Sequence, residues 1–303
     1  MNFRAITLDD QKAFTRITLA NPEYLHYQSI FGVIYVWKEF YHSRIYFGEG
    51  FLILEHQLEE KFFTFILENQ LLLPKVCGLI EQYCLANQFP KIVIKALSFE
   101  ENNYLQSQKY TSNLDRNDGD YIYQCSDLAN LIGKKYHAKR NFVNRFNLNY
   151  AYEVHEYQDQ DYHKLMDFYQ KWKITKEGVN YLDETQAIDC ALKNQAALQL
   201  KTIIFFHHQS IIGFTTISLA PNVPFSIFEK GDIHYEGIYQ FINNYVAINY
   251  LQEFTLVNRA EDLGLEGLRK AKLSYFPLFI LEKYQAIKNL NANNNDVLEI
   301  KSS

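Results

Sequence analysis

Apolar positions in the first half of the chain switch several times between a strand period and a helical period. Residues 9–20 and 73–89 repeat apolar side chains at helical spacing, and Pro74 suits the first turn of the second helix. Strands are predicted over four further segments, the first of which contains a Gly-Glu-Gly turn: 43–56, 61–67, 91–97 and 118–125. This half therefore predicts a domain of mixed helices and strands.

The second half repeats this order of elements. Helices are predicted over 161–174, 184–198, 235–251 and 264–275. Strands are predicted over 201–220, which turns as a hairpin at His208-Gln209-Ser210, over 253–257 and over 277–287. Strands with mostly antiparallel neighbours and covering helices favour an α+β fold. Because both halves share this order, we expect two copies of one domain.

A helix rich in basic residues is predicted between the halves, with Ser126 as its cap. Its basic side chains are expected to contact RNA or another anion: Lys134, Lys135, His137, Lys139, Arg140 and Arg145. The alternative is a charged linker helix that pairs with acidic neighbours such as Asp115, Asp118 and Asp120. The predicted domains are residues 1–126, the connecting helix 127–150 and residues 151–303.

Composition narrows the classes of function. The 303 residues, 48% of them apolar, suffice for two domains with real cores, and the formal net charge of -5 restricts nucleic-acid contact to a local patch. The four cysteines form no CxxC pair, so we expect reduced, mostly buried thiols and no metal site. No stretch approaches the ~18 to 20 apolar residues of a membrane span, and no signal sequence is evident. We therefore expect a cytoplasmic protein without a transmembrane segment.

Two sequence blocks carry a family resemblance: GKKYHAKRNFVNRF (133–146) and NRAEDLGLEGLRKAKLSY (258–275), accompanied by EKY (282–284). Together they resemble the DUF2156 family of bacterial proteins, which is related to the C-terminal domain of phosphatidylglycerol lysyltransferases. The resemblance implies two tandem acetyltransferase-like (GNAT) domains joined by a basic helix. Characterised relatives move an aminoacyl group from a charged tRNA onto a lipid head group.

The resemblance does not imply the substrate of this chain, so the donor and the acceptor are predictions. The expected donor is an aminoacyl-tRNA bound through the basic helix, with no permanently bound cofactor, and the acceptor is an amine or hydroxyl of a small molecule or lipid head group. Acetyl-CoA is less favoured, because CoA enzymes of this fold bind pyrophosphate in a glycine-rich loop, and Gly231 and Gly237 are too far apart to form one. An acyl-CoA-dependent N-acetyltransferase and a non-catalytic binding module remain the alternatives.

The segment 258–275 is the predicted site, because its charged residues directly follow an apolar strand, where ligands collect in such folds. Its cations are expected to hold anionic groups of the substrates: Arg259, Arg269 and Lys272. Its other polar residues are expected to orient the amine or the ribose: Asn258, Glu261 and Asp262. The alternative is a set of salt bridges that only stabilises the fold.

A base and an acid are predicted close to this segment. An amine must lose a proton before it attacks an ester, and Glu236, near the start of the helix 235–251, is the predicted base. Gln240 and Asn244 follow Glu236 on one polar stripe and are expected to bind substrate. The alternative for Glu236 is a carboxylate that complements the helix dipole. Tyr275 is predicted to donate a proton to the leaving group, with core packing as its alternative.

Overall fold

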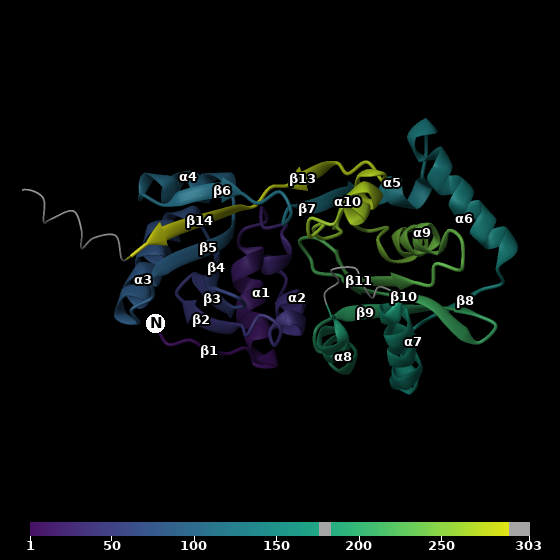
Figure 1. Cartoon of the computed structure of the whole chain (residues 1–303), viewed down its shortest axis with the longest axis horizontal. Helices are drawn as coiled ribbons and strands as arrows, with labels where there is room; N and C mark the ends of the chain where they lie inside the picture. Colours follow the sequence, from purple (N-terminus) through teal and green to yellow (C-terminus); the bar gives the residue numbers. More distant parts are fainter. Residues whose placement is uncertain (176–182, 291–303) are drawn as a thin grey trace, which may run out of the picture. The chain divides into compact units, whose positions relative to one another are not determined.

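The structure of the chain is a computed structural model that describes residues 1–175 and 183–290 (Figure 1). The chain forms two compact units. The units consist of these segments: Met1–Tyr24, Phe40–Asp118 and the segment from Glu282 for the first unit, and Leu25–Glu39 and Gly119–Leu281 for the second. Each unit contains one seven-stranded mixed sheet with helices, which confirms the predicted α+β class.

The sheet of the first unit has the strand order β1-β2-β3-β4-β5-β14-β6. These strands have the following bounds: β1 Arg4–Ala5, β2 Arg44–Gly48, β3 Phe51–Gln57, β4 Lys61–Leu67, β5 Lys91–Leu97, β14 Tyr284–Asn289 and β6 Thr111–Leu114. The unit also contains the helices α1 Gln11–Leu19, α3 Leu73–Ala86 and α4 Phe99–Ser107. Strands β4 and β5 are parallel, whereas the other neighbouring strands are antiparallel.

The sheet of the second unit has the order β13-β7-β12-β11-β10-β9-β8. These strands have the following bounds: β13 Phe279–Leu281, β7 Asp120–Gln124, β12 Leu256–Asn258, β11 Phe225–Gly231, β10 Ser210–Ser218, β9 Leu200–His207 and β8 Glu153–Glu156. The helices are α2 Phe31–Trp37, α5 Cys125–Asn130, α6 His137–Asn149, α7 Tyr162–Ile174, α8 Thr185–Lys193, α9 Ile238–Tyr250 and α10 Glu266–Leu273. Helix α9 packs its apolar residues onto β9 and β10.

The two sheets have the same plan, and each contains one strand supplied from the other half of the sequence. In both, three strands in chain order precede a parallel pair, which is β4–β5 in the first sheet and β11–β12 in the second. The next position holds β14 in the first sheet and β7 in the second, so the halves exchange one strand each. Figure 1 shows the C-terminal strand β14, in yellow, beside β5.

The predicted strand 277–287 is wrong as a single element. It consists of β13 and β14, which belong to different sheets, and the chain leaves one sheet for the other at Glu282 and Lys283. The break falls on the charged residues Glu282 and Lys283, and no glycine or proline marks it as a turn. The division into units therefore differs from the predicted ranges, because residues 25–39 belong to the second unit and residue 282 onward to the first.

The continuous basic helix predicted over 127–150 is also wrong. The chain breaks after α5, where Leu131 and Gly133 have φ of 49° and 93°, values that a helix does not allow. The helix resumes as α6, which lies within the second unit and stacks Phe146 on Phe241 of α9 with 4.3 Å between ring centroids. The basic residues are therefore spread over a turn and a helix that belong to one unit.

Other local predictions are confirmed. The hairpin turns at His208 and Gln209, whose φ values of 46° and 66° suit a two-residue hairpin turn. The four cysteines are free, three of them buried. Among residues 1–175 and 183–290, no helix combines the length and apolar character that a membrane crossing requires.

Candidate functional site

The parallel strands β11 and β12 pair only through Phe225 and Asn258, and a pocket opens beside them in the second unit. The empty space of this pocket measures about 350 Å³ when open solvent is included, and the part that can hold the centre of a water-sized group is about 20 Å³. Its apolar wall consists of Leu128, Ile217, Pro224, Phe225, Val246, Leu251 and Val257. Its polar side chains are Thr215, Ser226, Glu229, Asn243 and Arg259. A mostly apolar pocket with a few convergent polar groups is the usual form of a small-ligand site.

An ion pair between Arg259 and Glu229 forms the polar side of the pocket. Nη2 of Arg259 lies 3.4 Å from Oε2 of Glu229, and the two side chains are only 13% and 19% exposed. Asn243 donates to both carboxylate oxygens of Glu229 at 2.9 Å. The guanidinium also lies over the rings of Tyr123 and Tyr275, 5.4 and 5.1 Å from their centroids. Burial acts to lower the pKa of Arg259, but Glu229 and the two phenols outweigh it and raise that pKa.

Two buried polar atoms at this site have no hydrogen-bond partner among the described residues. They are Nη1 of Arg259 and the hydroxyl of Tyr275. Leaving a buried donor unpaired costs roughly 1–3 kcal/mol, so native structures seldom keep one without a reason. A ligand with acceptor oxygens would satisfy both donors.

Two lysines add positive charge next to Arg259. Lys272 donates to the backbone carbonyls of Arg259 and Ala260, and Lys139 donates to Oγ of Ser274 at 2.7 Å while lying 4.0 Å from the ring centroid of Tyr275. Burial and the charge of Arg259 lower the pKa of each lysine to about 8. The site thus gathers two lysines next to the ion pair of Arg259 and Glu229.

Asn258 and Asp262 shape the loop that follows β12. Both are completely buried, and the loop between them contains Ala260 with a φ of 60°, a strained value for a residue with a side chain. Oδ1 of Asn258 accepts from the N–H of Ala260 at 2.8 Å, and its amide donates to Asp120 at 2.9 Å. These contacts hold the loop in place, and the side chain of Arg259, which belongs to the loop, lines the pocket.

Asp262 is the centre of a saturated network. Its oxygens accept from Nε and Nη2 of Arg269, each at 2.8 Å, from the hydroxyl of Tyr121 at 2.6 Å and from the N–H of Gly264 at 2.9 Å. Burial acts to raise the pKa of Asp262, but these donors outweigh it and hold that pKa well below its usual range. Arg269 and Asp262 therefore form a two-point ion pair that stabilises the loop.

The other predicted site residues lie away from the pocket or serve the fold. Glu236 is exposed and pairs with Arg145 at 3.1 Å, so it is not among the pocket-lining residues. Asn244 donates to the carbonyls of Leu128 and Ala129 and ties α9 to α5, whereas Gln240 is half-buried on α9. Glu261 is half-buried, and its charge acts on Lys272.

Sequence reasoning missed Glu229 and Asn243. Glu229 interrupts the apolar pattern of β11, and Asn243 lies on the buried side of α9 beside Ile242. A polar residue at a core position was the available signal, because such residues need partners. Of the predicted residues, the structure brings Arg259, Lys272 and Tyr275 together.

The predicted RNA-binding residues have several partners within the second unit. Lys135 pairs with Asp127 at 3.3 Å, Arg140 donates to the carbonyls of Leu131 and Gly133, and Arg145 pairs with Glu236. Lys134 and His137 are exposed, and the ring of His137 lies 3.1 Å from the amide of Asn141. Lys139 lies beside the ring of Tyr275. RNA binding by these residues stays a prediction.

The start of α9 does not fit the pyrophosphate of CoA. A Cβ at Gly237, the N-cap residue, would lie 2.7 Å from the carbonyl oxygen of Phe142, so the backbone of α6 closely approaches this turn. An anion site at a helix start needs free N–H groups, and a neighbouring carbonyl oxygen repels an anion. Residues 1–175 and 183–290 also contain no group of three side chains suited to a metal ion.

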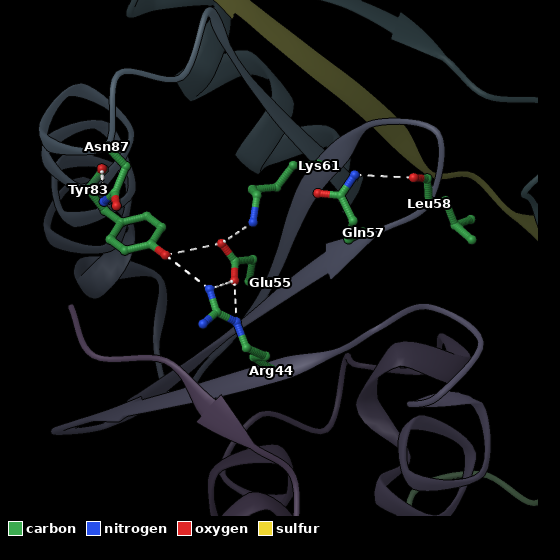
Figure 2. A network of polar contacts seen from close by, with 7 residues as sticks. All are labelled: Arg44, Glu55, Gln57, Leu58, Lys61, Tyr83 and Asn87. Atoms are coloured by element: carbon green, nitrogen blue, oxygen red, sulfur yellow. Dashed lines mark hydrogen bonds and ion pairs between the residues drawn. The ribbon is translucent and has the colours of Figure 1, made fainter.

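A second charged cluster lies in the first unit, and its groups satisfy one another. Figure 2 shows Glu55 of β3 between two cations and a phenol. Its oxygens accept from Nε of Arg44 at 2.7 Å, from Lys61 at 2.8 Å and from the hydroxyl of Tyr83 at 3.2 Å. In the described part of the chain, no buried side-chain atom of this cluster is left without a partner, whereas Nη1 of Arg259 is.

We expect the change Glu55→Gln to lower the free energy of unfolding by about 1–3 kcal/mol, because it removes charged hydrogen bonds at a buried position. Urea unfolding measures this effect. The matched change Glu60→Gln breaks a more exposed pair with Lys91 and should cost less than about 1 kcal/mol. Equal losses for the two variants would contradict the structural role of Glu55.

Comparisons with known proteins agree with the fold. A protein of unknown function from Bacteroides thetaiotaomicron has 30% sequence identity and a TM-score of 0.85, with 95% of this chain and 99% of that chain covered. L-PGS from Bacillus licheniformis is 14% identical with a TM-score of 0.69, over 94% and 93% of the chains. A tandem GNAT protein from the clavulanic acid biosynthesis pathway is 6% identical with a TM-score of 0.51, over 95% and 98%.

These likenesses show that the two sheets have the tandem GNAT arrangement. The family comparison covers residues 23–287, which include both sheets and the pocket. The chain therefore belongs to the phosphatidylglycerol lysyltransferase C-terminal family.

Proposed function

We propose that the protein is an aminoacyltransferase that uses an aminoacyl-tRNA and binds the aminoacyl end in the pocket beside β11 and β12. The observation that carries the proposal is the buried, unpartnered Nη1 of Arg259, a residue that lines this pocket, together with the unpartnered hydroxyl of Tyr275, whose ring lies next to the Arg259 guanidinium. Both atoms can donate to the oxygens of an ester. Membership of the family supports the choice of donor.

The reaction converts the ester carbonyl of the donor into a tetrahedral intermediate with negative charge on oxygen. An amine or hydroxyl of the acceptor attacks the carbonyl carbon and forms the new bond. The ester bond between this carbon and the ribose oxygen then breaks, and the acceptor's proton ends on the ribose oxygen that leaves. In our proposal Nη1 of Arg259 donates to the developing oxyanion, an interaction that strengthens as charge develops. Tyr275 donates to the leaving ribose oxygen, and Glu229 with Asn243 keeps the guanidinium oriented.

The contacts of three predicted site residues favour other roles for them in this proposal. Asn258 and Asp262 act as positioning residues in this proposal, because their polar atoms are occupied within the loop. Glu236 is less suitable as a base for this pocket, since it is exposed and paired with Arg145.

The first test is retention of tRNA on a filter. We expect the protein to retain aminoacyl-tRNA more strongly than the same uncharged tRNA, with retention falling steeply as salt rises because phosphate contacts release counterions. Acetyl-CoA should leave the thermal unfolding temperature unchanged. Equal retention of charged and uncharged tRNA would contradict the proposal, and a shift with acetyl-CoA alone would favour the N-acetyltransferase.

Retention should also fall as the pH rises from 7 to 9. The pKa of Lys139 is lowered to about 8, so this lysine is mostly charged at pH 7 and mostly neutral at pH 9, well before an ordinary lysine loses its proton. The variant Lys139→Arg should weaken the pH dependence, because arginine stays charged over this range. The matched variant Lys134→Arg changes an exposed position and should show the same pH dependence as the native protein. A flat profile for the native protein would contradict a role for Lys139 as a cation.

A further inference from the structure

Building on the proposed function, we propose that the pocket accepts an aminoacyl group with an uncharged, apolar side chain and discriminates against the ammonium of a lysyl group. The family takes its name from a lysyl transfer. The pocket of this chain differs in chemistry from what a lysyl side chain requires.

A lysyl ammonium in a buried pocket needs a carboxylate that is free to pair with it. Among the described residues that line the pocket, Glu229 has the one acidic side chain. Its oxygens already accept from Asn243 at 2.9 Å each, and Arg259 lies 3.4 Å from Oε2. An incoming ammonium would have to displace Arg259, which is itself buried.

The surrounding charge also opposes a second cation. Arg259 lines the pocket, and Lys272 binds the backbone carbonyl of Arg259. Lys139 lies over Tyr275, the ring that also faces Arg259. Like charges forced together in a site that excludes water cost several-fold to a thousandfold in affinity.

The walls favour an apolar side chain. Seven of the lining residues are apolar, among them Leu128, Phe225 and Val257. The hydroxyl of Thr215 is already committed to the carbonyl of Phe228 at 2.8 Å. Burying methylene groups against these walls stabilises the bound donor without any new polar partner.

The sharpest test compares lysine with norleucine, which has the same number of side-chain carbons and no side-chain ammonium. One tRNA transcript is charged with either amino acid by an acylating ribozyme, so that the RNA and the α-amino group are identical. We expect norleucyl-tRNA to be retained by the native protein at least about 30-fold more tightly than lysyl-tRNA. Equal retention, or a preference for lysyl-tRNA, would overturn the inference.

The variant Ser226→Asp tests the physical cause and leaves Arg259 and Tyr275 in place. Ser226 lines the pocket, so the change supplies the free carboxylate that a lysyl ammonium lacks there, and the ratio of lysyl to norleucyl retention should rise by about tenfold or more over the native ratio. The matched change Ser226→Asn adds no charge and should leave the ratio unchanged. An unchanged ratio in a folded Ser226→Asp variant would overturn the role of charge in the pocket, and if the variant fails to fold, the native ratio decides alone. If charged tRNA of either kind is retained no better than uncharged tRNA, the proposed function itself fails, which differs from a wrong side-chain preference.

Discussion

Replacing Arg259 with methionine is expected to remove most of the difference in retention between aminoacyl-tRNA and uncharged tRNA, a loss of about 100-fold for the charged form. The reason is that Arg259 has a buried N–H group without a partner at the pocket, and a charged hydrogen bond there contributes about 1.5–3 kcal/mol. Filter retention at constant salt measures the effect. The matched variant Arg145→Met removes an exposed arginine of α6 and should lower the retention of charged and uncharged tRNA by the same factor.

A second variant separates function from stability at the same place. Tyr275→Phe removes a buried hydroxyl that has no partner, so the free energy of unfolding should stay equal or rise. Retention of aminoacyl-tRNA, or the rate of transfer once an acceptor is known, should still fall about tenfold. If Tyr275→Phe binds and transfers like the native protein, the hydroxyl has no role in handling the donor.

Replacing Arg269 with methionine is expected to lower the free energy of unfolding by about 3 kcal/mol, because it leaves the fully buried Asp262 carboxylate without its cation. Urea unfolding at pH 7 measures the loss. The pKa of Asp262 is held below its usual range in the folded protein, so this stability is present above a pH of about 4 and disappears as the pH falls further. The gap between the native protein and the variant should therefore narrow in acid.

The neighbouring change Lys270→Met is the control for helix α10. Lys270 is exposed, and its replacement should alter the free energy of unfolding by less than about 0.5 kcal/mol. Similar losses for Arg269→Met and Lys270→Met would show that the network around Asp262 contributes little beyond an ordinary surface helix.

The candidate site was only partly predictable. The segment 258–275 is recognisable because charges follow directly on an apolar strand, and three of its residues, Arg259, Lys272 and Tyr275, do meet. Glu229 and Asn243 come from β11 and α9, and no local spacing links them to Arg259. Glu236 is a carboxylate near the start of α9, as a general base would require, but its side chain is exposed and pairs with Arg145.

The sequence by itself determined the elements whose signal is local. Periodicity and turn residues predict most of the helices and strands, the hairpin at His208 and the repeat of one α+β plan, because these depend on neighbours within a few residues. Tertiary structure alone decided which sheet receives β7 and β14 and which charges share a pocket. Strand β7 pairs with β12 and β14 pairs with β5 across more than a hundred positions, and the ion pair of the pocket joins residues 30 positions apart. The free energy of those contacts depends on burial that no local pattern records.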